Sequence, residues 1–171
     1  MMKFKVDTEL FPFESRFLET ISGATVHYVD EGEGPTILML HGNPTWSFLY
    51  RKMILKLRGR FRCIALDYPG FGLSTAPPDY DFYPDSHSQA LREVIEKLGL
   101  TNFLLVMQDW CGPIGLAAAE QFPERVRGLI LGNTWAWPLK GQAKFERFWR
   151  CIERRFRTLR IGSRRRFFRA S

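Results

Sequence analysis

Short apolar runs recur along most of the chain and predict strands. The alternating run at 25–29 is typical of a half-buried strand. The unbroken run TILML at 36–40 indicates a strand that is buried on both faces of a sheet. Three further runs, at 61–66, 103–107 and 128–132, complete the set of predicted strands.

Between these runs, apolar residues recur at steps of three or four positions, which is the spacing of an amphipathic helix. The pattern predicts helices at 46–57, 85–98 and 112–122. Gly99 follows the second of them and is a typical helix terminator. A fourth helix is predicted at about 143–160, after the last strand.

Strands that alternate with helices indicate βαβ units. We therefore predict an α/β fold with a mostly parallel sheet and helices on both of its faces. In such sheets, ligands bind beyond the carboxyl ends of the strands. That rule selects the loops 41–45, 67–74 and 108–112 as the candidate site.

The chain has 171 residues and a formal net charge of +7, but the positive charge is concentrated at one end. Residues 140–171 contain twelve Lys and Arg against two Glu, whereas residues 1–139 contain 13 basic and 16 acidic residues. We therefore divide the chain into a body, 1–139, and a basic tail, 140–171, that is cap-like or disordered. Because the body is mildly acidic, we expect no specific nucleic-acid partner.

The three cysteines, Cys63, Cys111 and Cys151, are few, odd in number and far apart, so they indicate neither a disulfide framework nor a zinc site. No apolar run approaches the roughly 20 residues that span a bilayer. The first residues contain no apolar stretch typical of a secretory signal. We expect a cytoplasmic protein that has no metal and no membrane attachment.

The segment QDWCG at 108–112 lies between a predicted strand and a predicted helix. A sharp strand–turn–helix connection of this kind, a nucleophile elbow, exposes one side chain at the edge of the sheet. Here that side chain is Asp109, whose carboxylate can attack an electrophilic carbon and form a covalent ester. The alternative is that Asp109 only caps the following helix.

Four segments resemble the haloalkane dehalogenases of the α/β-hydrolase fold. They are HGNPTWSFLYR at 41–51, YPGFGLS at 68–74, QDW at 108–110 and PERVRG at 123–128. The resemblance covers about residues 10–139. It implies an α/β-hydrolase core that is truncated after about the sixth strand and is followed in the sequence by the start of a helical cap.

The resemblance also implies roles for particular residues. Asp109 would displace halide from a small haloalkane and form an alkyl ester. The Trp110 indole and the Asn43 side chain would donate hydrogen bonds to the departing halide, and the backbone N–H groups of both residues would form the oxyanion hole. The family uses no metal and no organic cofactor, and the residue at His41 is a structural loop residue.

Two features depart from the family pattern. Cys111 stands where the family usually has Gly, so we expect its side chain to strain the turn and its thiol to be inert. The family hydrolyses its ester with a His, oriented by an acid, that comes late in the chain. The three histidines, His27, His41 and His87, all come before that region, and Asn133 stands where some members carry the acid. We therefore expect both groups to lie outside this chain.

Two other hypotheses remain open. Epoxide hydrolases share the Asp nucleophile and an HG-x-P loop, although Asn43 favours a dehalogenase because it can donate to a halide. A non-catalytic, truncated remnant is the second hypothesis, and the abrupt change in charge at Lys140 suggests it. His87 is expected to be structural. Trp135 and Trp137 are expected either to line the site or to serve in packing.

Overall fold

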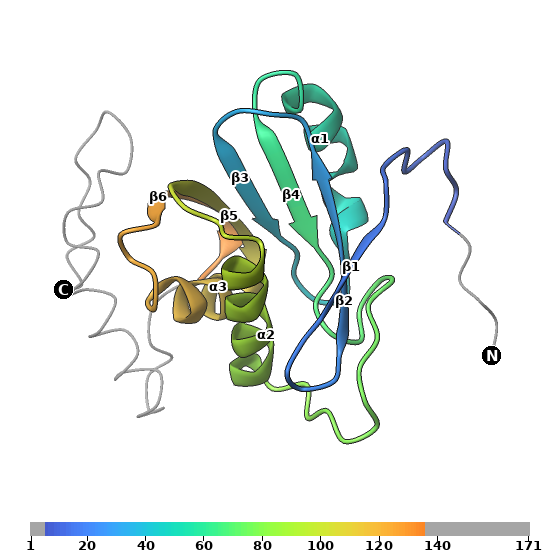
Figure 1. The fold of residues 1–171 in the computed structure, drawn as a ribbon, viewed down its shortest axis with the longest axis vertical. Coiled ribbons are helices and arrows are strands. Elements are labelled where there is room, and N and C mark those ends of the chain that lie inside the picture. Colours follow the sequence, from blue (N-terminus) through green and yellow to red (C-terminus); the bar gives the residue numbers. More distant parts are fainter. Residues whose placement is uncertain (1–5, 136–171) are drawn as a thin grey trace.

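Six strands form one mixed, mostly parallel sheet in the computed structural model, which describes residues 6–135 (Figure 1). The strands are β1 Arg16–Glu19, β2 Thr25–Glu31, β3 Thr36–Leu40, β4 Arg62–Leu66, β5 Phe103–Asp109 and β6 Val126–Thr134. Their order is β1-β2-β4-β3-β5-β6. The pairs β1–β2 and β2–β4 are antiparallel, and the other three pairs are parallel. The α/β fold predicted from the sequence is confirmed.

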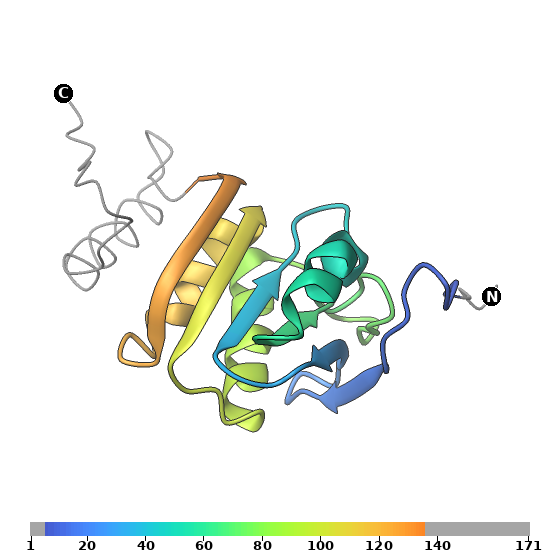
Figure 2. The same cartoon turned by 90° about the horizontal axis from the view of Figure 1, so that it is seen from above.

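Helices cover both faces of the sheet (Figure 2). One face carries the 3₁₀ helix η1 Ser47–Tyr50 and the helix α1 Arg51–Leu57. The other face carries α2 Pro84–Lys97 and α3 Cys111–Ala119. The single helix predicted at 46–57 is therefore a 3₁₀ turn that continues into a short α-helix, whereas the other two helices in this part are confirmed with slightly shifted ends.

The core has two layers, because the central strands bury side chains on both faces. Leu38 and Leu40 of β3 pack into the layer under α2 and α3. Ile37 and Met39 of the same strand pack into the layer under η1 and α1, which includes Ile54. The continuous apolar run at 36–40 thus has the burial that its pattern predicted.

The outer strands differ most from the sequence-based expectation. β1 was not predicted, because most of its residues are exposed and it lacks an alternating pattern. β2 continues through Asp30 and Glu31, whose carboxylates pair with Arg62 at 2.6 Å and Arg58 at 2.9 Å. These ion pairs offset the cost of placing two acidic residues in a strand.

The topology brings the three selected loops to one edge of the sheet. The neighbouring parallel strands β4, β3 and β5 all end there, so the loops 67–74, 41–45 and 108–112 lie side by side. The predicted helix at 143–160, Trp137, Cys151 and the basic tail lie outside the described residues. Within the described residues, no helix is both long and apolar enough to cross a membrane.

Candidate active site

Asp109 lies at the apex of a tight turn between β5 and α3. Its backbone is left-handed, with a φ of 56°, and Trp110 and the first residue of α3 follow at once. A non-glycine residue in this conformation costs of order 1–3 kcal/mol and is found mainly where surrounding contacts enforce it. Here one such contact is the Thr134 hydroxyl of β6, which donates a hydrogen bond to the Asp109 carbonyl.

The carboxylate of Asp109 is held from the neighbouring loop. The backbone N–H of Asn43 donates a 2.9 Å hydrogen bond to Oδ1 of Asp109. Gly42 lies directly beneath this side chain, because a Cβ at Gly42 would lie 2.4 Å from the Asp109 Cβ and 2.5 Å from Oδ1. The glycine is therefore needed for the close approach of the two loops.

A cavity of about 200 Å³ opens beside this turn. Its wall is mostly apolar and aromatic, and it consists of His41, Gly42, Asn43, Tyr68, Phe71, Phe82, Pro84, His87, Trp110 and Ile114. Asn43 and Trp110, the two halide donors implied by the resemblance, both lie in this wall. The structure thus brings the three candidate residues together, since Asp109 adjoins both of them.

Trp135 packs against the edge of this site without lining the cavity. Its ring meets the Trp110 ring edge-to-face, with the two centroids 4.9 Å apart. The buried Trp135 Nε1 has no hydrogen-bond partner among the described residues. Of the two expectations for Trp135, the structure agrees with packing.

His41 is fixed as a structural residue of the loop. Its Nδ1 lies 2.9 Å from the Gly42 carbonyl, and its Nε2 lies 3.0 Å from the backbone N–H of Tyr68. Nδ1 must therefore carry the proton, and Nε2 must accept. Burial lowers the pKa of His41, against the opposing effects of the Gly42 carbonyl and Asp67. Because both nitrogens are occupied, His41 is not placed to act as a base.

His87 has a part that sequence reasoning missed. It is buried in the first turns of α2, as expected of a structural residue, and its Nδ1 lies 3.3 Å from the Tyr80 hydroxyl. It also lines the cavity. Burial and the nearby His41 lower its pKa to about 4, so the ring is neutral at pH 7. Helices that connect parallel strands begin near the edge of the sheet at which the strands end, where ligands bind. The position of His87 near the start of a predicted helix was therefore the signal that could have placed it close to the site.

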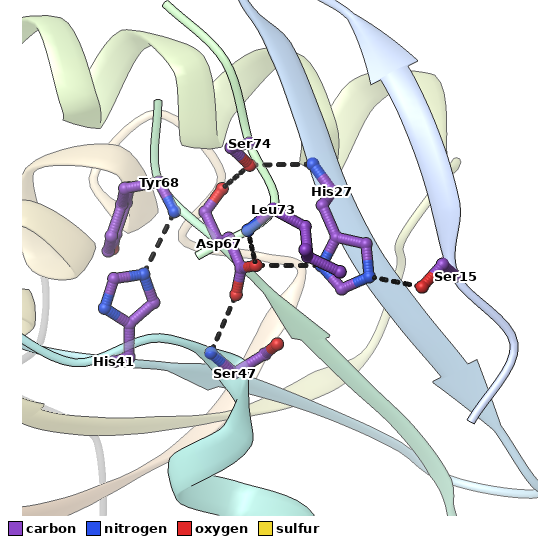
Figure 3. A network of polar contacts seen from close by, with 8 residues as sticks. All are labelled: Ser15, His27, His41, Ser47, Asp67, Tyr68, Leu73 and Ser74. Atoms are coloured by element: carbon purple, nitrogen blue, oxygen red, sulfur yellow. Dashed lines mark hydrogen bonds and ion pairs between the residues drawn. The ribbon is translucent and has the colours of Figure 1, made fainter. Parts of the chain in front are cut away.

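A buried network of polar contacts holds the loop 67–74 (Figure 3). Asp67 and His27 are fully buried, and Oδ2 of Asp67 lies 2.9 Å from Nδ1 of His27. The backbone N–H groups of Ser47 and Leu73 donate to the same carboxylate at 2.7 and 2.9 Å. The Ser74 hydroxyl donates to the Asp67 carbonyl at 2.7 Å.

These contacts determine the charge of Asp67. Burial by itself would raise its pKa, but the hydrogen bond and charge of His27, together with the two backbone N–H donors, lower the pKa below its ordinary value. Asp67 is therefore a buried carboxylate that stays ionised. The contacts of Asp67 join β2, the first residue of η1 and the loop 67–74 to one another.

Cys111 is the first residue of α3 and the second residue after the nucleophile candidate Asp109. Its side chain is buried, and Sγ lies 2.7 Å from the carbonyl oxygens of Leu40 and Gln108 and from the Gln108 nitrogen. These are close contacts for sulfur, in agreement with the expected crowding. Burial raises the pKa of Cys111 to about 12, so its thiol is unreactive at neutral pH.

Asn133 is part of an irregularity at the end of β6. Its φ is 49°, and it lies between Gly132 and Thr134, which pair with Gln108 and Asp109. No carboxylate is therefore present at this position. Among the described residues, no group of three or more His, Cys, Asp or Glu is placed to hold a metal ion.

Comparison with known proteins identifies the family of the chain. Residues 35–166 match the family described as alpha/beta hydrolase fold. The chain belongs to the alpha/beta hydrolase fold family. The chain is also similar to haloalkane dehalogenase 2 of Mycobacterium tuberculosis, with 53% identity over 135 residues that make up 79% of this chain and 47% of the relative.

The chain is also similar to solved structures of alpha/beta hydrolases. A haloalkane dehalogenase from Bradyrhizobium elkani has 30% identity and a TM-score of 0.69, over 75% of this chain and 44% of the other. Epoxide hydrolases from hot-environment metagenomes have 31% identity and a TM-score of 0.65, over 71% of this chain and 42% of the other. The 171-residue chain thus spans about half the length of the curated dehalogenases that it matches.

Proposed function

We propose that Asp109 is the nucleophile of a hydrolytic dehalogenation of small haloalkanes. The observation that carries the proposal is the 2.9 Å hydrogen bond to Oδ1 of Asp109 from the backbone of Asn43, a residue that lines an apolar cavity. This bond leaves Oδ2 as the attacking oxygen. Oδ2 forms a bond to the carbon that bears the halogen, and the carbon–halogen bond breaks with its electron pair leaving on the halide.

Asn43 and Trp110 suit the departing halide. Both are neutral hydrogen-bond donors in the cavity wall. Because they carry no positive charge, they can stabilise a halide anion without forming an ion pair with the Asp109 carboxylate. Donors positioned where charge develops are worth several kcal/mol in a site that excludes water. The Asn43 side chain would therefore stabilise the halide while its backbone N–H holds the carboxylate.

The alkyl ester would then be hydrolysed by water, which attacks Cγ of Asp109 and needs a base to take its proton. During this step Oδ1 becomes an oxyanion, and the Asn43 N–H already donates to it. Of the three histidines in the sequence, His41 has both nitrogens engaged, and His27 is buried against Asp67 and Ser15. His87 lies in the cavity wall, but its pKa of about 4 makes it a weak base.

We therefore expect this 171-residue chain to form the ester far faster than it hydrolyses it, since general-base assistance contributes about 10²–10⁴-fold. The test is the amount of bromide released on incubation with 1-bromobutane. We expect about one bromide per chain, released in a single phase, and none above background from Asp109→Asn. Release from Asp109→Asn at the rate of the unaltered chain would contradict the proposal.

Epoxide opening is the second candidate, favoured by the similarity to epoxide hydrolases. It would use the same attack by Asp109, but the oxygen of the opened ring leaves as an alkoxide and requires a proton donor. Asn43 and Trp110 are too weakly acidic for that task, whereas a halide needs hydrogen bonds only. Faster ester formation with 1,2-epoxybutane than with 1-bromobutane would favour this alternative.

A further inference from the structure

Phe82 has an unusual backbone conformation for a bulky residue. It lies in the loop between β4 and α2, and its φ is 56°. A left-handed conformation is an outlier for a side chain of this size and is found mainly where surrounding contacts or function require it. Phe82 belongs to the cavity wall, yet it is 52% exposed. It therefore lies where the cavity wall meets the solvent.

Contacts on several sides hold the Phe82 ring at this place. The ring meets the Tyr80 ring edge-to-face, with the centroids 5.1 Å apart, and its centroid lies 6.3 Å from that of His87. It also lies directly against the backbone of Gly70, because a Cβ at Gly70 would be 2.4 Å from Cε1 of Phe82. A glycine at position 70 thus makes room for the ring.

A series of aromatic rings connects Phe82 with the loop that holds the Asp109 carboxylate. His41, in that loop, lies 5.4 Å from Phe71 between ring centroids. Phe71 lies 5.7 Å from His87, and His87 lies 6.3 Å from Phe82. All four rings belong to the cavity wall. Two rings therefore separate Phe82 from the loop beside the nucleophile.

The volume of the cavity limits the length of an alkyl chain within it. About 200 Å³ holds roughly seven groups of the size of a water molecule, at about 30 Å³ each. 1-Bromobutane fits within this volume, whereas the longer chain of 1-bromooctane has to pass beyond the wall. The wall residue at the end of the ring series then decides whether the longer chain is accepted.

We propose that the Phe82 ring sets the upper limit on the length of the haloalkane that can reach Asp109. With the halogen at Asn43 and Trp110, the alkyl chain extends along the ring series toward Phe82. A chain that is too long collides with this ring, which Gly70 and its aromatic neighbours hold in place. This inference rests on the proposed attack by Asp109, and it assigns Phe82 to the selection of substrate and not to the chemical step.

The test compares 1-bromobutane with 1-bromooctane. The second-order rate of ester formation is followed by intact-mass spectrometry for the unaltered chain, Phe82→Ala and Phe82→Leu. Tyr83→Ala is the matched control, because Tyr83 is the next residue, is also aromatic and 68% exposed, and is not part of the cavity wall. The ratio of the octyl rate to the butyl rate, compared between variants, cancels the intrinsic reactivity of the two reagents.

We expect this ratio to rise about tenfold in Phe82→Ala, the lower end of the effect of one methylene group in an apolar pocket. The rise should be smaller in Phe82→Leu, and Tyr83→Ala should leave the ratio unchanged. An unchanged ratio in both Phe82 variants, or an equal rise in Tyr83→Ala, overturns this inference alone, because both esters still form. Absence of an ester from both reagents, in a chain that unfolds cooperatively, overturns the proposed function and this inference with it.

Discussion

The backbone N–H of Asn43 donates a 2.9 Å hydrogen bond to Oδ1 of Asp109, and this contact joins the ends of the adjacent parallel strands β3 and β5. The carboxylate is thereby oriented by the backbone of a neighbouring loop and not by another titratable side chain. The Asn43 side chain remains available for a second task, which makes the two functions of this residue separable by mutation.

Asn43→Ala should therefore keep the orientation of Asp109 and lose only the side-chain amide. We expect Asn43→Ala and Trp110→Phe each to slow ester formation about 10²–10³-fold, the usual effect of removing one donor to a developing charge. The control is Trp135→Phe, which keeps an aromatic side chain at the position that packs against Trp110 but makes it smaller and removes the unpartnered indole N–H. Rates measured by intact-mass spectrometry within threefold of the unaltered chain would exclude a halide-binding role.

Gly42→Ala should displace the nucleophile. A methyl group at this position would collide with the Asp109 side chain at 2.4–2.5 Å, so either the loop or the carboxylate must move. We expect ester formation to fall by more than tenfold, since small misplacements of a nucleophile are costly. Gly59→Ala is the matched control, because no atom lies within 4 Å of the added methyl group. Equal loss in both variants would argue against a specific steric effect at the site.

The Asp67–His27 pair should be a large contributor to stability. Asp67→Asn removes a buried charge from its partner, a change that typically costs 3–5 kcal/mol. We expect a loss of about 3 kcal/mol or more in the free energy of unfolding at pH 7, measured with urea. The exposed Asp79 provides the control variant, Asp79→Asn, and its stability should change little.

The contribution of Asp67 also depends on pH in a defined direction. Its pKa in the folded chain lies below the ordinary 3.8, so its stabilisation is present above about pH 4 and is lost as the pH falls through the lower folded value. The difference in stability between the unaltered chain and Asp67→Asn should shrink below pH 4. A difference that is constant down to pH 2 would contradict an ionised Asp67.

His87 should destabilise the fold at mildly acidic pH. Its pKa is about 4 in the folded chain against 6.5 ordinarily, so the unfolded chain binds a proton in this interval that the folded chain does not. Stability from this group is complete above about pH 7 and falls toward pH 4. Between pH 7 and 5 the unaltered chain should lose about 1–2 kcal/mol more than His87→Leu, a value reduced because the cavity opens to solvent. Equal losses in urea titrations would contradict a buried, neutral His87.

The sequence predicted the elements whose side chains carry a clear pattern. The run at 36–40 and the helices over α2 and α3 were recovered because burial on both faces, or on one helical stripe, leaves a regular signal. β1 was missed because a short, exposed strand has no such signal. The break between η1 and α1 was missed because the apolar spacing runs through it.

In the candidate site, too, the residues with a local sequence pattern could be predicted and the others could not. Asp109, Asn43 and Trp110 could be named as candidates because their loops follow predicted strands and resemble a known family. The His27–Asp67 pair was not found, since it depends on the antiparallel pairing of β2 with β4, which sets Asp67 opposite His27. No local pattern encodes that pairing. The position of His87 in the cavity wall became known only from the structure.

The most direct measurement of the central claim is the location of the alkyl group after incubation with 1-bromobutane at pH 7. Peptide mass spectrometry should find a butyl ester on Asp109, at up to one per chain, and none in Asp109→Asn. Burial raises the pKa of Cys63 to about 11 and that of Cys111 to about 12, so neither thiol should compete. Peptide mapping separates any label on Cys151 from the ester.

An ester on Asp109 that accumulates without continued bromide release is the result that the account predicts. Continued release that is lost in His87→Leu would show that His87 acts as a base and would contradict the expected accumulation. A chain that unfolds cooperatively in urea but carries no label on Asp109 would contradict the nucleophile itself and favour a non-catalytic protein.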